Sequence, residues 1–291
     1  AVLRMLIKYA VGIEVPATYN GLGYNNLIYM SLLLAKMQAD GSVTYMKRNA
    51  KVLSFLAVEE CEAHLHPAMQ YKFLKFLQDN NSNGHVRQIF MPSHSTQIAS
   101  AVKLDDLICL TSPALGQINV GYPRVIYREE CPDDMASKQY VQRFLDATKA
   151  DMFFANRLIF VEGIAEELLL PVFARYLGKD LTDEHVLVVN MGVRYFKHFL
   201  KLFDTNNQNT INKKIVCLTD IDPCRKKKES GESYEACYPY EYNIDVDNYD
   251  YKHHADTEVD QYANHPNIRF YRQDATYGKT LEYDLMHENP N

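Results

Sequence analysis

The chain has 291 residues, of which 47% are hydrophobic and 23% are charged, a composition typical of a soluble globular protein with about two domains. Its formal net charge of -6 excludes nucleic-acid binding through bulk basicity, so DNA contact requires a local basic patch or metal ions. The six cysteines form no C-x-x-C pair, which argues against zinc and disulfides. Without a membrane-spanning run or a signal-peptide pattern, we expect a cytoplasmic protein with no membrane partner.

The first predicted elements are a strand around residues 11–15 and an apolar helix over residues 27–37. Between them, Asn20, Gly21 and Gly23 belong to a glycine-containing loop. Glycines before a helix leave backbone N–H groups free to contact an anion at the positive helix end. The same residues also suit an ordinary turn and helix cap, so both interpretations stay open.

Two further strands of the first half end in polar residues. An apolar strand over residues 52–58 leads into Glu59 and Glu60, and a strand over residues 88–92 leads into His94. A helix is expected over residues 71–77 between them. The segment after the acids also contains two histidines, at positions 64 and 66, a spacing that suits a metal but is more often structural beside a proline.

This order of elements resembles the Walker B strand, D-loop and switch strand of ABC-type ATPases related to DNA-repair proteins. The resemblance implies that Glu59 helps to hold Mg²⁺, that Glu60 polarises the attacking water and that His94 senses the γ-phosphate. The P-loop pattern G-x-x-x-x-G-K-[ST] does not occur; residues 278–280 copy its end, but Gln273 stands where its first glycine belongs. We therefore expect this chain to be the carboxyl-terminal part of a longer protein.

The middle of the chain predicts a link between two domains. Residues 111–137 are polar and interrupted by prolines and glycines, as is typical of a connecting region. Residues 138–157 then predict one amphipathic helix whose apolar face docks the two domains.

The second half is organised around an apolar strand, residues 158–161, that ends in Glu162 and Gly163 and is followed by a helix from Ala165. Glutamate and glycine at a strand end can be no more than a turn. However, another strand over residues 214–219 ends in Asp220 and Asp222. Because the carboxyl ends of neighbouring parallel strands meet at one edge of a sheet, we expect the three acids to face one cation.

A third strand, residues 186–190, lies between these two in the sequence. It is expected to end in a turn at Gly192 and to lead into an amphipathic helix over residues 195–203. A last helix is expected from Leu281, with Thr280 as its cap.

Residues 223–267 contain a basic run at residues 225–228, many acids and a high density of tyrosines. One interpretation is a surface insertion without a binding role. The other is a nucleic-acid contact, in which the basic run contacts phosphates and tyrosines stack on bases, although the interspersed acids oppose it. The tyrosines concerned are Tyr234, Tyr238, Tyr240, Tyr242, Tyr249, Tyr251 and Tyr262.

The strand and helix order of the second half, with its Glu-Gly and D-x-D motifs, resembles the Toprim domain of topoisomerases, primases and certain nucleases. Nearly the whole chain resembles the OLD-family nucleases. The resemblance rests on six motifs, which occur in the order N-G-L-G-Y-N-N-L, E-E-C-E-A-H-L-H-P, P-S-H-S, F-V-E-G-I-A-E-E, T-D-I-D and K-T-L-E-Y-D-L. These nucleases are ATPase–Toprim proteins of bacteria and phages, and they include the nuclease subunit of Gabija-type defence systems. In this chain Cys61 stands where the family usually has proline.

The resemblance implies an α/β fold in three parts. Residues 1–110 would be the carboxyl-terminal part of an ABC-type ATPase head, and residues 111–151 a connecting region with a docking helix. Residues 152–291 would be a Toprim domain with a Rossmann-like, mostly parallel sheet and an insertion over residues 223–267.

The implied function is a divalent-metal-dependent DNA endonuclease that nicks or cuts both strands. In the full-length protein ATP would regulate it, and its role would be anti-phage defence or DNA processing. Two Mg²⁺ or Mn²⁺ ions about 4 Å apart would activate a water and stabilise the leaving oxygen. The implied partners are DNA, further copies of the chain in a homo-oligomer that forms through the ATPase and Toprim domains, and a helicase or other defence-system protein. The implied metal ligands are Glu162, Glu166, Asp220, Asp222 and Glu282, with Lys279 neutralising the transition-state phosphate.

Two other classes of function stay open. A Toprim domain also serves topoisomerases, which need a tyrosine nucleophile, but no winged-helix domain is recognisable to present one. A non-catalytic clamp or scaffold of the ATPase type is the other alternative, and the complete set of acids argues against it.

Overall fold

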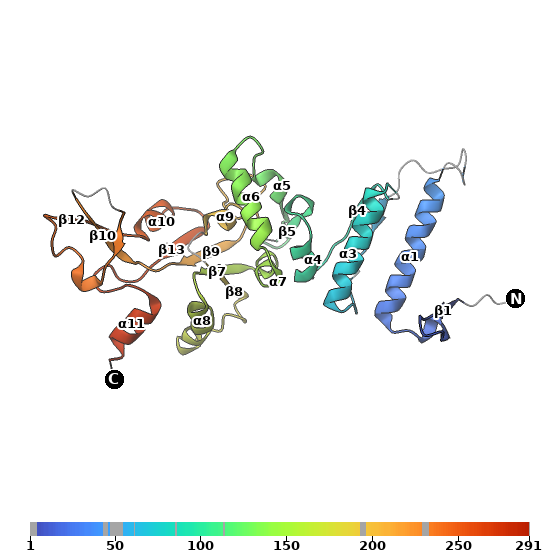
Figure 1. The fold of residues 1–291 in the computed structure, drawn as a ribbon, viewed down its shortest axis with the longest axis horizontal. Coiled ribbons are helices and arrows are strands. Elements are labelled where there is room, and N and C mark those ends of the chain that lie inside the picture. The colour runs from blue at the N-terminus through green and yellow to red at the C-terminus, as the bar shows by residue number, and fades with distance from the viewer. Residues whose placement is uncertain are drawn as a thin grey trace. The chain divides into compact units, whose positions relative to one another are not determined.

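The computed structural model describes residues 5–42, 46, 55–60, 62–84, 86–112, 114–192, 196–228 and 233–290. The chain divides into two compact units, residues 1–101 and residues 102–291. Figure 1 labels many of their elements. The predicted domain boundaries near residues 110 and 151 stay a prediction. Cys61, the start of the strand predicted over residues 52–58 and the start of the helix predicted over residues 195–203 lie outside the described residues.

The first unit opens with a hairpin rather than with the single strand expected around residues 11–15. Strands β1 (Leu6–Lys8) and β2 (Glu14–Pro16) pair antiparallel. Gly12 adopts a φ of 84° in the turn between them, a conformation that glycine tolerates without steric penalty. The apolar residues near position 11 therefore lie in the turn, and the prediction was wrong in its position.

Helix α1 (Leu22–Gly41) begins five residues earlier than the predicted start at residue 27. Gly21 is its N-cap, so Gly23 lies inside the first turn and not in a loop. A Cβ atom at Gly23 would lie 2.5 Å from the carbonyl oxygen of His64, so the close approach of these two segments requires glycine.

The core of the first unit forms where α1 packs with the following elements. Strand β3 (Phe55–Ala57) pairs parallel with β4 (Gln88–Phe90). The other elements that the structure describes in this unit are η1 (Ala17–Tyr19), α3 (Pro67–Ser82) and α4 (Thr96–Ala101). The buried core residues are Met30, Leu34, Leu56, Phe73, Leu77, Val86 and Ile98.

The second unit begins with short elements instead of an unstructured connection followed by one long helix. In chain order they are η3 (Leu104–Asp106), β5 (Cys109–Thr111), β6 (Asn119–Gly121), α5 (Pro123–Ile126), α6 (Pro132–Phe144), α7 (Ala147–Ala150) and η4 (Asp151–Phe153). The helix predicted over residues 138–157 is interrupted because α6 ends at Phe144 and Asp146 starts a new helix. The Asp146 carboxylate accepts a hydrogen bond from the Lys149 N–H at 2.8 Å, which is a typical N-cap.

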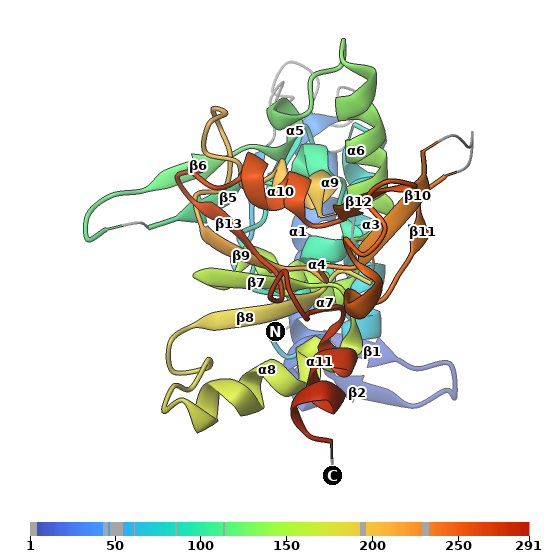
Figure 2. The ribbon, with the colours of Figure 1, turned by 90° about the vertical axis from the view of Figure 1, so that its left-hand side faces the viewer.

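A four-stranded parallel sheet organises the second unit, and the predicted α/β fold is confirmed. Its order is β13-β9-β7-β8, which Figure 2 shows side by side. The strands are β7 (Arg157–Val161), β8 (Val186–Asn190), β9 (Lys214–Leu218) and β13 (Ile268–Tyr271). From β7 the chain moves outward to β8 and then returns past β7 to β9. The carboxyl ends of β7 and β9 therefore flank the point where the topology changes direction, the usual ligand position in open α/β sheets.

Helices α8 (Ile164–Tyr176) and α9 (Lys197–Leu200) connect these strands. Gly192 makes the expected turn after β8, with a φ of 72°. Helix α9 is shorter than predicted, because residues 201–203 continue as turns. Phe160, Phe196 and Phe203 are each at most 1% exposed in the core beside the sheet.

The described parts of the segment 223–267, residues 223–228 and 233–267, form regular elements as well as loops. Strand β10 (Pro223–Lys227), which carries most of the basic run, pairs antiparallel with β11 (Glu235–Ala236) and β12 (Tyr249–His253). The other elements of this part are η5 (Pro239–Glu241), α10 (Asp256–Gln261) and, after β13, α11 (Leu281–Glu288). Among the described helices, none combines the length and apolar character needed to cross a bilayer.

A candidate carboxylate site at the sheet edge

Glu162 and Asp220 meet at the switch point of the sheet. Glu162 directly follows β7, and Asp220 is the second residue after β9. The Glu162 carboxylate accepts hydrogen bonds from the Asp220 backbone N–H, at 3.1 Å, and from the Thr219 hydroxyl. Both acids are half-buried. The structure thus brings two of the predicted ligands together, and Thr219 is a supporting residue that the sequence did not reveal.

A glutamine that follows the neighbouring strand β13 orients Asp220. The Gln273 Nε2 group donates to Asp220 Oδ1 at 2.6 Å, and Gln273 Oε1 accepts from the Ile221 N–H at 2.7 Å. The backbone N–H of Leu281 donates to the same Oδ1 atom at 3.2 Å. One carboxylate oxygen is therefore fixed by two donors, and the orientation of Oδ2 is fixed with it.

Sequence reasoning missed Gln273 as a site residue because it did not predict β13. The strand is short and polar residues precede it, but it places Gln273 at the same sheet edge as Glu162 and Asp220. The alternation of Ile268, Arg269 and Phe270 was the available signal, since residues of a half-buried strand alternate in this way.

The electrostatics of this edge fit a cation. Burial, followed by repulsion from the carboxylates of Glu162 and Glu166, raises the pKa of Asp220 from 3.8 to about 6. A divalent cation would offset both unfavourable contributions, and carboxylate oxygens are the ligands that Mg²⁺ and Mn²⁺ prefer. The donor set present therefore fits the implied metal.

Glu166 also has a structural role at the start of α8. Its carboxylate accepts a hydrogen bond from the Gly163 N–H at 3.1 Å, so it caps the helix from the third helical position. Its negative charge also contributes, after burial and Glu162, to the raised pKa of Asp220.

Asp222 and Lys279 are joined through the backbone. Asp222 has a φ of 39°, an uncommon left-handed conformation, and its N–H donates to the Lys279 carbonyl oxygen at 3.2 Å. The Lys279 ammonium lies 3.6 Å from the centre of the Tyr238 ring, a cation–π contact. The structure therefore shows Lys279 on an aromatic ring, and its predicted contact with phosphate stays a prediction.

Glu282 lies at the start of α11, where its side chain is exposed. The predicted cap of this helix is correct, because the Thr280 hydroxyl accepts a hydrogen bond from the Tyr283 N–H at 3.2 Å. Within the described ranges, no three carboxylate, histidine or cysteine side chains are grouped closely enough to form a metal site by themselves. The five-ligand assignment stays a prediction, with Glu162 and Asp220 as its directly connected pair.

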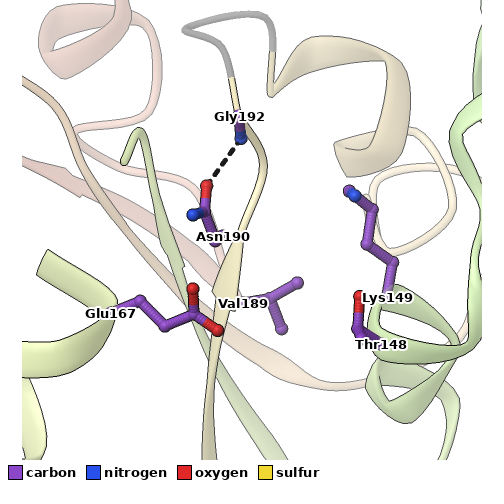
Figure 3. A pocket seen from close by; sticks show the side chains of 6 residues that line it. All are labelled: Thr148, Lys149, Glu167, Val189, Asn190 and Gly192. Atoms are coloured by element: carbon purple, nitrogen blue, oxygen red, sulfur yellow. Dashed lines mark hydrogen bonds between the residues drawn. The ribbon is translucent and has the colours of Figure 1, made fainter. Parts of the chain in front are cut away.

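A hollow of about 330 Å³ lies at the carboxyl end of β8 (Figure 3). Within it, the Asn190 side-chain oxygen accepts a hydrogen bond from the Gly192 N–H at 2.8 Å. None of the predicted site residues lines this hollow. The lining residues are Thr148, Lys149, Glu167, Val189, Asn190 and Gly192.

The first unit places its predicted site residues at one edge of the β3–β4 pair. Glu59 and Glu60 follow β3 and are exposed, and His94 is exposed after β4. Glu62 connects the two segments, since its carboxylate accepts hydrogen bonds from the His94 N–H at 3.1 Å and from the Ser93 hydroxyl. Sequence reasoning gave Glu62 no role.

The remaining predicted residues of the first unit have structural contacts. Asn20 accepts a hydrogen bond from the Tyr9 hydroxyl, and it precedes the helix cap Gly21. His66 caps α3, with Nδ1 accepting from the Ala68 N–H at 3.3 Å, which supports the structural interpretation of the histidine pair. Nucleotide binding by Asn20, Gly21, Gly23, Glu59 and His94 stays a prediction.

Comparisons with known proteins agree with this two-part organisation. Residues 3–99 match the family model described as AAA ATPase domain, and residues 153–222 match the model described as Overcoming lysogenization defect protein-like, TOPRIM domain. A curated relative, Endonuclease GajA of Bacillus cereus (strain HuB5-5), is 25% identical over 198 residues. The match covers 59% of this chain and 27% of the relative's length.

Among solved structures, the C-terminal region of the Xanthomonas campestris pv. campestris OLD protein is similar, with 22% identity and a TM-score of 0.28. The similarity covers 48% of this chain and 58% of that chain.

Proposed function

We propose that this chain, which belongs to the OLD family and joins an AAA ATPase region to an OLD-like Toprim domain, is a divalent-metal-dependent DNA endonuclease. The observation that carries the proposal is the contact between Glu162 and Asp220 at the switch point of the parallel sheet. A half-buried acid pair at this position suits metal-assisted phosphodiester hydrolysis, which requires no nucleophilic side chain. The similarity to a protein named as an endonuclease supports the same reaction.

The chain's own residues would hold and orient the reacting groups. Glu162 and Asp220 would be the primary metal ligands, and Asp222, Glu166 and Glu282 would complete the set. Bound Mg²⁺ or Mn²⁺, in a pair, supplies activation of water and stabilisation of the leaving oxygen. Gln273 and the Leu281 N–H hold Oδ1 of Asp220, so that Oδ2 is presented in one orientation.

We further propose that ATP regulates cleavage in the full-length protein. The first unit would contribute Glu59 to the Mg²⁺ of the nucleotide, Glu60 to the attacking water and His94 to the γ-phosphate. This assignment is supported by the parallel pairing of β3 and β4, because the three residues follow the carboxyl ends of these two strands. The same proposal includes a role in anti-phage defence or DNA processing and a cytoplasmic location. It also includes assembly into a homo-oligomer and a helicase or other defence protein as partner.

The products formed from supercoiled plasmid test which class of activity the protein has. With Mg²⁺ or Mn²⁺, an endonuclease yields nicked or linear plasmid, a topoisomerase yields relaxed closed circles, and a scaffold leaves the substrate unchanged. We expect nicked or linear plasmid and no product in EDTA. Relaxed closed circles would instead support the topoisomerase alternative.

A further inference from the structure

We propose that Tyr238 and Tyr240 form a stacking platform for an unpaired base of single-stranded DNA beside the carboxylate site. The inference rests on the proposed nuclease function and names the form of DNA that the site receives. We call these two side chains the tyrosine platform.

The structure separates Tyr240 from the other tyrosines of residues 223–267, because its ring stacks on Tyr238 and is otherwise 66% exposed. Tyr238 itself also carries the Lys279 ammonium, 3.6 Å from its ring centre. Most of the others already use a ring face within the fold. Tyr242 stacks on His253 at 4.2 Å and 13°, and Tyr262 stacks on Phe270 at 5.0 Å. Arg225 lies over the Tyr249 ring at 5.1 Å, and Lys252 lies over the Tyr234 ring at 4.1 Å. Tyr251 packs against both Tyr242 and Tyr249.

The geometry of the platform suits stacking. The rings of Tyr238 and Tyr240 are nearly parallel, with an angle of 9° and a centroid separation of 5.3 Å. Tyr240 is 66% exposed and Tyr238 44% exposed, so part of the stacked pair is open to solvent. A base placed on the exposed part of Tyr240 would extend a stack that already exists.

The platform is held in position before any ligand arrives. The Tyr238 N–H donates to Glu241 at 2.8 Å, and Pro239 restricts the backbone between the two rings. Glu241 in turn lies 3.4 Å from the Arg225 guanidinium, which offsets its negative charge. Rings that are ordered in advance lose little conformational entropy on binding.

The platform is also connected to the carboxylate site. Lys279 contacts the Tyr238 ring through its ammonium, and its carbonyl oxygen accepts the N–H of Asp222. On α11, Tyr283 packs against Tyr238 with ring centres 6.2 Å apart, and Leu281 of the same helix bonds to Asp220. The platform and the acids are therefore joined through the contacts of Lys279 and α11.

The basic run explains DNA contact less well than the platform does. Arg225 forms ion pairs with Glu235 and Glu241, and the Lys228 ammonium donates to the Val246 carbonyl oxygen at 2.5 Å. Arg225 and Lys228 are thus engaged within the protein. Stacking requires an open base face, which a continuous duplex does not offer, so the ligand that fits is a single-stranded segment.

The test measures binding of a dye-labelled oligothymidine of about 16 nucleotides to the 291-residue chain by fluorescence anisotropy in EDTA, where cleavage is absent. We expect the double variant Tyr238→Leu/Tyr240→Leu to bind about 5- to 100-fold more weakly than the unchanged chain. The double variant Tyr238→Phe/Tyr240→Phe should bind as the unchanged chain does, because stacking needs the ring and not the hydroxyl. Tyr176→Leu is the matched control, since Tyr176 is 84% exposed on α8. The single variant Tyr240→Leu leaves the contact between Lys279 and Tyr238 intact and should show part of the loss.

Three outcomes would overturn the platform: unchanged affinity of both leucine variants, equal binding of an abasic oligonucleotide, or tighter binding of duplex than of the single strand. An RNA oligonucleotide of the same sequence shows whether the sugar matters. Plasmid cleavage, assayed in parallel, separates this proposal from the nuclease proposal. Platform-dependent binding without cleavage would refute only the nuclease, and cleavage with unchanged binding of the leucine variants would refute only the platform.

Discussion

Replacing Asp220 with asparagine should stabilise the metal-free protein and remove its response to divalent cations. Because burial and the charges of Glu162 and Glu166 raise the pKa of Asp220 from 3.8 to about 6, keeping this group ionised at neutral pH destabilises the fold. One pKa unit corresponds to about 1.4 kcal/mol, which gives an upper limit of about 3 kcal/mol. Partial exposure of the carboxylate reduces the expected gain to about 1–2 kcal/mol. Asparagine retains an oxygen for the bonds from Gln273 and Leu281.

The sign of the pH dependence follows from the raised pKa of Asp220. Between pH 3.8 and about 6 the folded state binds more protons at this site than the unfolded state does. The stability contributed by the protonated group is therefore present at low pH and is lost as the pH rises through about 6. The difference in free energy of unfolding between the variant and the unchanged protein should be small at about pH 4 and should reach its full value above about pH 7.

Urea unfolding in EDTA and in Mn²⁺ measures both parts of this prediction. Mn²⁺ at about one hundred times its Kd should stabilise the unchanged protein by about 2.7 kcal/mol and the variant much less, so that their order of stability reverses. Asp183→Asn, at an exposed position before β8, is the matched control and should change neither result. An Asp220→Asn protein that is less stable in EDTA, or that responds equally to Mn²⁺, would refute the assignment.

Three other substitutions test separate parts of the account. Gln273→Leu should lower the plasmid cleavage rate about tenfold or more while leaving the protein folded, because a positioning contact to Asp220 is lost. An unchanged rate and unchanged Mn²⁺ affinity would exclude a positioning role for Gln273. In the full-length protein, Glu60→Gln should block ATP hydrolysis but not ATP binding, and an equal loss of both would make Glu60 structural. Gly23→Ala should destabilise the first unit by about 1–3 kcal/mol in thermal unfolding, because the alanine Cβ would lie 2.5 Å from the His64 carbonyl oxygen. An unchanged unfolding temperature would show that the segments containing Gly23 and His64 separate freely.

The sequence was sufficient to predict the elements whose signals are local. Strands β7 and β9 are short apolar runs that end abruptly in acids, and this pattern located Glu162 and Asp220 at neighbouring strand ends. The turn at Gly192 and the cap at Thr280 rest on residue types with specific backbone or side-chain preferences.

Features that depend on tertiary contacts were not predictable in this way. Lys213 is buried although it is charged, because its ammonium donates to the carbonyl oxygens of Met152 at 2.9 Å and Phe153 at 2.7 Å. Gln273 gains its role only when β13 pairs with β9. The boundaries of α6 and α1 also differ from those that the apolar pattern suggested, because Asp146 caps a new helix after α6 and α1 already begins after Gly21.

The decisive measurement is the initial rate of plasmid cleavage as Mn²⁺ is titrated into the unchanged protein and into Asp220→Asn. For the unchanged protein we expect a rate that rises from zero and saturates with Mn²⁺. For the variant we expect no cleavage at any Mn²⁺ concentration, although the variant is folded. Cleavage that proceeds in EDTA, or cleavage by Asp220→Asn at the unchanged rate, would contradict a metal-dependent site at Glu162 and Asp220.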